Sequence, residues 1–145
     1  AALAKASNQN DVAVKNNLGV VALREGRIED AVKFFNEANN AEAKTNLGVT
    51  SILNGNYSDA LSRYNGTGDY NEALSNVLSG NLDKASSILN DKTDAQSEYL
   101  KAVIAARKGD CTQVAACLAR AYAKDPSLKQ KAAGDIEFAK CKDSI

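Results

Sequence analysis

The 145-residue chain has no histidine, no methionine and no tryptophan, and it has only one proline. Without histidine, Ser-His and Cys-His nucleophile arrangements are excluded, and so is any histidine-ligated metal site. Because methionine is missing even from the first position, we expect an excised domain or a processed product of a longer protein. No run approaches the ~20 apolar residues of a membrane-spanning helix, so we expect no direct membrane insertion.

The chain also lacks an excess of charge of either sign, since 18 basic residues balance 18 acidic ones. No field of one sign would therefore steer nucleic acid or an anionic membrane toward it. The lysines are spread along the sequence rather than clustered with aromatic residues, and phosphate-binding glycine loops are absent. We expect no nucleic-acid partner and no cofactor.

Cysteine is scarce as well, and the count is odd: Cys111, Cys117 and Cys141. An odd count argues against a disulfide framework and favours reduced or buried, core-filling side chains. Cys111 and Cys117 lie six residues apart, on different faces of one predicted helix, and neither has a partner at metal-ligand spacing. We expect no metal site, with Cys141 near the end of the chain as the cysteine that could be exposed.

What the chain does have is helical periodicity, repeated several times and without the alternation typical of strands. Gly26, Gly55, Gly80 and Gly109 interrupt this periodicity at spacings of 29, 25 and 29 residues. Periods in this range indicate stacked helix pairs, each too small to bury its own apolar face. The predicted repeat units are residues 10–40, 41–68, 69–92 and 93–126.

The flanking segments complete this prediction of one helical repeat domain over residues 1–145. Residues 1–9 resemble the tail of a preceding helix, and Asn10-Asp11 is a predicted N-cap pair. Pro126 should end the last repeat helix, because proline cannot continue a helix and pushes Asp125 out of helical geometry. A capping helix is predicted over residues 127–143.

The repeated residues resemble the tetratricopeptide repeat family, which has Leu-Gly, aromatic, alanine and proline positions at fixed spacing. Matches in the first two units are Leu18-Gly19, Ala31, Phe35 and Ala38, then Leu47-Gly48, Gly55, Tyr57, Ala60 and Tyr64. Matches in the last two are Ala73, Gly80, Leu82, Ala85 and Leu89, then Ala102, Gly109-Asp110, Leu118, Ala121 and Asp125-Pro126. The units are shorter than the family's ~34 residues, and the signature tryptophan is missing.

This resemblance implies an all-α fold: an α-solenoid of about four antiparallel helix pairs in a right-handed superhelix, with a C-terminal capping helix. Paired helices approach closely where both carry small residues. The expected small-residue pairs are Gly19 with Ala31, Gly48 with Ala60, Ala73 with Ala85, and, more loosely, Ala102 with Val114. Larger side chains should fill the space between units, namely Phe35, Tyr64, Leu89 and Leu118.

In this family the first helix of each pair lines a concave groove, which implies a surface for a peptide or protein. The implied groove residues are Asn16, Val20, Leu23, Arg24, Val49, Leu53, Tyr70, Leu74, Tyr99, Val103 and Arg107. The set is mostly apolar and suits an amphipathic helix or an apolar extended peptide, with Arg24 and Arg107 orienting a polar end. An equally open interpretation is that several of these residues pack between units or against a neighbouring repeat.

One well-known subset of the family clamps a C-terminal carboxylate, with lysine and asparagine on the first helices. Here the residue after Leu-Gly is Val20 in one unit and Val49 in the next, where the clamp has asparagine. Asn16 stands where the clamp has lysine. The sequence therefore argues against a carboxylate clamp.

The leading hypothesis is a non-enzymatic protein-interaction scaffold. The alternative is a self-association or spacer module within a larger bacterial envelope or cytoplasmic protein, with both compartments open. An enzymatic hypothesis would depend on carboxylates such as Asp91 or Asp135. These positions are typical of helix caps and solvated charge instead.

Overall fold

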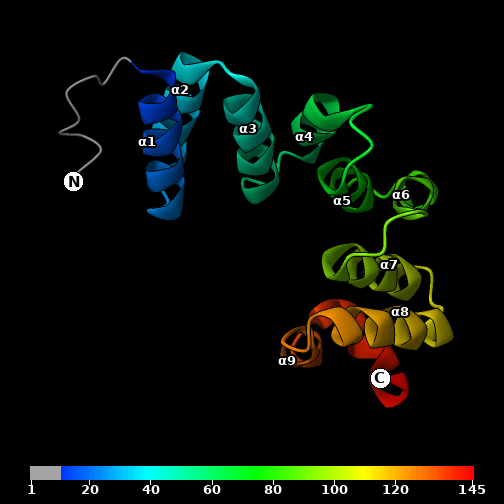
Figure 1. Ribbon diagram of the computed structural model, residues 1–145. Coiled ribbons are helices and arrows are strands. Elements are labelled where there is room, and N and C mark those ends of the chain that lie inside the picture. The colour runs from blue at the N-terminus through cyan, green and yellow to red at the C-terminus, as the bar shows by residue number, and fades with distance from the viewer. Residues whose placement is uncertain (1–10) are drawn as a thin grey trace. The chain divides into compact units, whose positions relative to one another are not determined.

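The computed structural model describes residues 11–145, which are helical or irregular and contain no strand (Figure 1). Contacts divide the chain into two compact units, Ala1–Thr67 and Gly68–Ile145. The first unit holds α1 (Val12–Arg24), α2 (Ile28–Ala38), α3 (Ala41–Leu53) and α4 (Tyr57–Tyr64). The second holds α5 (Tyr70–Leu78), α6 (Leu82–Leu89), α7 (Ala95–Arg107), α8 (Cys111–Lys124), α9 (Leu128–Ala133) and the 3₁₀ segment η2 (Ile136–Ser144).

The all-α prediction is confirmed, and consecutive helices pack as neighbouring pairs: α1 with α2, α3 with α4, α5 with α6 and α7 with α8. The single-domain boundaries, the solenoid geometry and its hand stay predictions. The helix tail predicted for residues 1–9, and Asn10 of the predicted cap pair, lie outside the described residues.

Short polar side chains start most of the described helices. Asp11 accepts a hydrogen bond from the amide of Ala13 at 2.8 Å, which confirms its predicted capping role. Equivalent side-chain caps begin α3, α4, α5, α7, α8 and η2, from Asn40, Asn56, Asp69, Asp94, Asp110 and Asp135. Each cap satisfies an amide that has no partner within its helix, which sets where the helix begins.

The four predicted glycine breaks end the first helix of each pair in one shared way. Gly26 has a φ of 76°, its amide bonds to Leu23 O, and the next amide, of Arg27, bonds to Ala22 O. The same two bonds recur around Gly55, Gly80 and Gly109, all with positive φ. This arrangement is the Schellman motif, in which glycine takes the left-handed conformation without a Cβ penalty.

The helices of the first two pairs approach closely at Gly19 and Gly48, but the partner side chain differs from the expected one. A Cβ on Gly19 would lie closer than 3.0 Å to ring atoms of Phe35, and one on Gly48 would meet the Tyr64 ring in the same way. The aromatic ring of the second helix therefore fills the space above each glycine. Ala31, the expected partner of Gly19, is fully buried without being the nearest contact.

In the second unit, small or branched residues occupy the corresponding positions. Ala73, Ala85, Ala102 and Val114 are each fully buried. They belong to one apolar core that runs from α5 through α8 to Phe138 and Cys141 in η2. Leu89 and Leu118, the residues expected between units, lie in this core as well.

The end of the chain differs from the prediction in two ways. The single helix expected over residues 127–143 is interrupted, because α9 ends at Ala133 and η2 starts only after the Asp135 cap. The expectation of no disulfide is also wrong. Cys111 and Cys141 are bonded to each other, with Cα atoms 5.2 Å apart. Cys141 is buried rather than exposed, and only Cys117 is a free, buried thiol.

A buried carboxylate joins α7 to α8. Glu98 accepts hydrogen bonds from Arg120 Nε at 2.9 Å and Lys101 Nζ at 3.1 Å. Burial opposes ionisation of Glu98, but these two cations outweigh it and lower the pKa of the carboxyl below its usual range. The Lys101 ammonium also donates to Lys92 O at 2.6 Å, so the same cluster fixes the turn before α7.

We predict that Gly19→Ala or Gly48→Ala destabilises the protein. Alanine in an exposed helix is favoured over glycine by ~0.5–1 kcal/mol, but overpacking against an aromatic ring costs ~1–3 kcal/mol. The net loss should appear as a lower midpoint in thermal or urea unfolding followed by circular dichroism. The matched control is Gly134→Ala, whose Cβ would lie 4.0 Å from its nearest neighbour, Lys131 O. An unchanged midpoint for both test variants would contradict the packing described.

We further predict that Glu98→Gln lowers stability at pH 7 by about 1–3 kcal/mol. The lower half of that range is expected because Arg120 is 52% exposed and its attraction is screened by solvent. Since the pKa of Glu98 is lowered by folding, its contribution is present at neutral pH and is lost as pH falls through the folded-state pKa. Unfolding across acidic pH should therefore be less pH-dependent in the variant. Glu42→Gln, at an exposed position, is the control and should leave the wild-type profile.

Candidate functional site

The predicted groove residues of the first unit lie on two neighbouring helices, α1 and α3. Asn16 is 1% exposed, and its Oδ1 accepts a hydrogen bond from Asn46 Nδ2 at 3.0 Å. This residue therefore joins the two helices and is not open to a ligand. Val20 and Leu23 are half-buried and pack on the core of the unit, whereas Arg24 is exposed at the end of α1.

The α3 residues form the more open part of this surface. Leu53 is 65% exposed, the most exposed leucine that the structure describes, and Val49 one turn earlier is half-buried. An exposed leucine beside a half-buried valine leaves an apolar strip for contact. Single exposed apolar residues are common, so the strip alone does not identify a ligand.

In the second unit the groove residues divide into two groups. Tyr70 and Leu74 of α5 are half-buried and pack on the core, and burial raises the pKa of the Tyr70 hydroxyl. Tyr99 and Val103 of α7 are buried, at 7% and 8% exposed. They are therefore covered, and η2 supplies contacts to α7.

Tyr99 is held from three directions by the end of the chain. Its hydroxyl donates to Asp135 Oδ2 at 2.6 Å, and its ring meets Phe138 edge-on with centroids 5.4 Å apart. Lys131 Nζ of α9 lies 4.7 Å from the Tyr99 ring centroid, within cation–π range. Phe138 itself is 1% exposed. The α7 surface predicted to bind a peptide is thus occupied by the chain's own C-terminal segment, which consists of Asp135 and η2.

Arg107 at the end of α7 also contacts this segment. Its guanidinium makes a two-pronged pair with the Glu137 carboxylate, at 3.0 Å from Nε and 2.5 Å from Nη2. Its Nη1 donates to Val77 O of α5 at 2.8 Å. This fork geometry is the one that guanidinium groups use for carboxylates. Arg107 was expected to orient a polar end of a ligand, and in the structure its guanidinium pairs with a carboxylate of the same chain.

The electrostatic consequence appears at Tyr99. Burial is the main cause that raises the pKa of its hydroxyl far above the usual range, and the hydrogen bond to the Asp135 carboxylate raises it further. The tyrosine hydroxyl therefore stays protonated and donates. Asp135, one of the carboxylates on which an enzymatic hypothesis would depend, accepts this hydrogen bond and caps η2.

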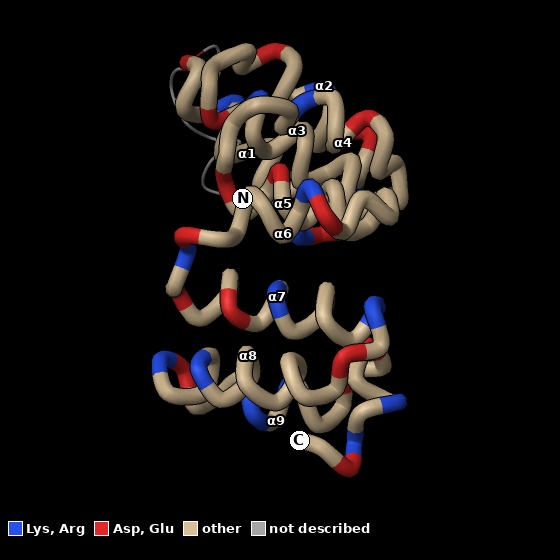
Figure 2. Tube along the Cα trace, turned by 90° about the vertical axis from the view of Figure 1, so that its right-hand side faces the viewer, with Lys and Arg blue, Asp and Glu red and all other residues tan. Residues whose placement is uncertain are grey.

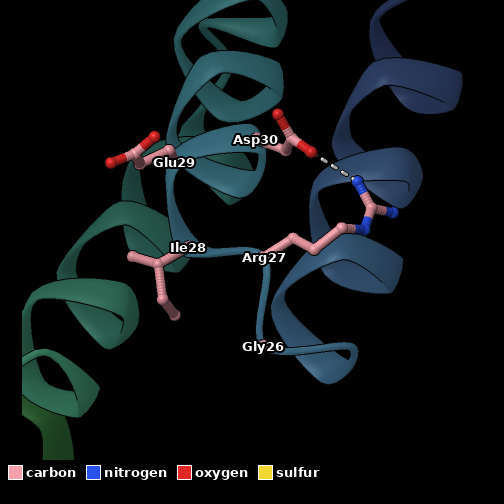
Figure 3. A pocket seen from close by; sticks show the side chains of 5 residues that line it. All are labelled: Gly26, Arg27, Ile28, Glu29 and Asp30. Carbon is pink, nitrogen blue, oxygen red and sulfur yellow. Dashed lines mark hydrogen bonds and ion pairs between the residues drawn. The ribbon is translucent and has the colours of Figure 1, made fainter.

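Two of the open hollows among the described residues have an arginine in their lining. One surrounds the turn between α1 and α2 and is lined by residues 26–30, with the Arg27 guanidinium turned toward Asp30 at 2.7 Å (Figure 3). Arg27 also pairs with Glu25 at 2.7 Å, so one cation is shared between two carboxylates, and with Glu29 the hollow keeps an excess of negative charge. The other, of about 450 Å³, is lined by Ala106, Arg107, Ile136, Glu137, Ala139 and Lys140. It lies where α7 meets η2.

Basic and acidic residues are interspersed along the helices of each unit (Figure 2). Within residues 11–145, no three cysteine, aspartate or glutamate side chains gather in a way that could hold a metal ion. Along the same residues, no helix has both the length and the apolar character needed to cross a bilayer.

The contribution of the C-terminal segment is what sequence reasoning missed. From the sequence, Asp135 is typical of helix caps and solvated charge, and residues 127–143 are predicted only to form a capping helix. The available signal was a lone aromatic beside two acids in a polar segment, with a cysteine three residues later.

Comparison of the chain with protein-family models and with curated proteins finds no match. The tetratricopeptide-like pattern therefore remains a resemblance carried by the residues themselves.

We predict that Asp135→Asn lowers the pKa of Tyr99 toward its ordinary value. The substitution removes a negative charge that disfavours the tyrosinate, so ionisation should begin at lower pH. The readout is tyrosinate absorbance during alkaline titration, compared with wild type. Asp143→Asn, at an exposed position near the end of η2, should leave the titration unchanged. Identical curves for wild type and Asp135→Asn would contradict the Tyr99–Asp135 bond.

Proposed function

We propose that this chain is a non-enzymatic protein-interaction module of tetratricopeptide-like architecture, which binds a peptide or helix through the first helices of its pairs. The finer architecture in this proposal is an α-solenoid of right-handed twist. It is supported by the left-handed glycine that follows each of α1, α3, α5 and α7. It is also supported by the small residue that each of these helices carries at the matching position, namely Gly19, Gly48, Ala73 and Ala102.

The observation that carries the proposal is the contact between the first helices of successive pairs. Within the first unit α1 contacts α3, and within the second α5 contacts α7. Within the first unit, α1 and α3 then provide a continuous surface for an extended or helical segment. Helix-in-groove recognition needs such a surface, with apolar side chains at regular intervals.

Within this surface, Val20 and Leu23 of α1 and Val49 and Leu53 of α3 are the proposed contacts. All four are at least partly exposed, so an apolar ligand would remove their side chains from water. Burying apolar area contributes ~25 cal/mol per Å² before the costs of association. Arg24, exposed beside them, would orient an acidic end of the ligand.

The test uses a displayed library of amphipathic and apolar peptides, selected on the wild-type chain. Affinities of the selected peptides are then measured on Leu53→Asp and on Val49→Asp/Leu53→Asp. We expect Kd to rise at least tenfold, equivalent to ~1.4 kcal/mol, because a charge replaces an apolar contact. Leu53 is 65% exposed, so the single variant should keep its fold, which circular dichroism checks.

The matched control is Tyr57→Asp, which places the same charge at a partly exposed position on α4, a second helix of a pair. It should leave the affinities unchanged. Unaltered affinity in folded Leu53→Asp would reject the groove. If light scattering then gave a mass well above that of the monomer, self-association would be the better account.

A further inference from the structure

The C-terminal segment contacts α7 in the way that a bound peptide would. Three of its side chains make specific contacts: Asp135 with the Tyr99 hydroxyl, Phe138 with the Tyr99 ring, and Glu137 with Arg107. These are one hydrogen bond, one aromatic contact and one paired carboxylate, spread over four consecutive residues. They describe a recognition pattern of acid, any residue, acid, aromatic.

The second position of this pattern is free to vary. Ile136 is 87% exposed, although it is the most apolar residue of the segment, and it lies at the rim of the hollow that Arg107 and Lys140 also line. An isoleucine that faces water contributes little to holding the segment. Binding to α7 therefore depends on Asp135, Glu137 and Phe138.

The segment has little stability of its own. η2 consists of short 3₁₀ turns on either side of a kink at Cys141, whose backbone is not helical. Hydrogen-bond geometry is poorer in 3₁₀ helices than in α-helices, and such short turns gain little stability from their own hydrogen bonds. Contacts with α7 and α8, together with the Cys111–Cys141 bond, hold the segment in this conformation.

The disulfide is placed where it prevents release. Cys111 is the first residue of α8, and Cys141 lies three residues beyond Phe138 and 30 positions after Cys111 in the sequence. With this bond closed, residues 135–138 cannot leave α7 by fraying from the C-terminus. With it open, only the side-chain contacts remain.

We propose that the Tyr99–Arg107 face of α7 is a peptide-binding site for acid–x–acid–aromatic segments, filled by the chain's own residues 135–138 until the Cys111–Cys141 bond is reduced. A dithiol reductant breaks the S–S bond by supplying two electrons and two protons. Cys111 and Cys141 become thiols, and the reductant becomes a disulfide. A partner segment of the same pattern then replaces residues 135–138. This inference rests on the proposed function, because it names the ligand pattern for the α7 part of the groove.

The first experiment is hydrogen exchange on the full chain with and without dithiothreitol. We expect the amides of residues 136–144 to exchange roughly tenfold faster or more after reduction, because the tether that limits their opening is gone. The amides in the middle of α7 and α8 should keep their protection. If α7, α8 and η2 lose protection together, or if none of them changes, the segment is a fixed part of the core and the proposal is wrong.

The second experiment measures binding in trans. The probe is a fluorescent peptide of residues 134–145 with Cys141→Ser, added to the oxidised wild type and to a Cys111→Ser/Cys141→Ser/Phe138→Ala chain. The triple variant lacks both the tether and the aromatic anchor of its own segment. We expect binding to the variant and at least ~tenfold weaker binding to the oxidised wild type, which has no vacant site. Equal binding to both, or none to a variant that circular dichroism shows to be folded, overturns the proposal.

A test variant, its matched control and an altered peptide show whether the recognition is specific. Arg107→Ala added to the open variant should weaken peptide binding at least ~tenfold, since it removes the carboxylate partner. Lys108→Ala should not, because Lys108 pairs with Asp83 at 2.7 Å and does not reach η2 in this arrangement. A peptide with Glu137→Lys should fail to bind. If Arg107→Ala and Lys108→Ala weaken binding equally, the attraction is non-specific charge and the site is rejected.

These two experiments can fail or succeed independently of the test of the proposed function. Loss of library-peptide affinity in Leu53→Asp concerns α3 of the first unit, whereas exchange and trans binding concern α7 of the second. Failure here with success there would leave a groove on α1 and α3 and make η2 a plain terminal cap.

Discussion

Close approach between two helices, at a position with no side chain, is the constraint on which the helix pairs of the first unit depend. Gly19 and Gly48 lie under the rings of Phe35 and Tyr64 at distances that exclude even a methyl group. In each pair, the ring on the second helix fills the space that a side chain at the glycine would take, and so it packs the two helices together. In the second unit Ala73 and Ala102 take the same positions, and smaller or aliphatic neighbours, such as Leu89 and Leu118, fill the space.

Left-handed glycine stops make this packing repeatable. A first helix that ran on past Gly26 or Gly55 would carry its chain away from the partner. The Schellman bonds reverse the chain within a few residues, so that the second helix can return along the first. Two buried polar residues of the first helices, Thr50 and Asn76, bond within their own helix. Thr50 Oγ1 donates to Asn46 O, and Asn76 Nδ2 donates to Glu72 O, so burial of these groups does not leave them without partners.

These local devices are why most of the fold could be predicted from the sequence. Asp11, the four glycines and Pro126 act on their immediate neighbours, and the periodic apolar residues between them define the helices. The end of the chain could not be predicted in the same way. Whether residues 127–143 form one helix depends on contacts of Phe138 and Cys141 with α7 and α8, which are distant in sequence. The partner of Cys111 could not be chosen by counting three cysteines.

For the candidate groove, the resemblance places residues on a face of α7 but does not give their partners. Tyr99 and Arg107 on that face contact Asp135, Phe138 and Glu137 of the same chain. These contacts follow from tertiary structure alone, because they join residues that are distant in sequence. On α1, the resemblance implies a groove position for Asn16. In the structure its side chain is buried and joins α1 to α3 through a hydrogen bond with Asn46.

The Cys111–Cys141 bond also changes what chain cleavage would mean for this molecule. The connection between α8 and α9 contains the exposed residues Pro126 and Ser127, and it lies inside the loop that the disulfide closes. A protease that cut there once would leave both pieces covalently joined. The nicked molecule would keep its mass until a reductant separated it, so its integrity would depend on redox conditions as well as on the peptide backbone.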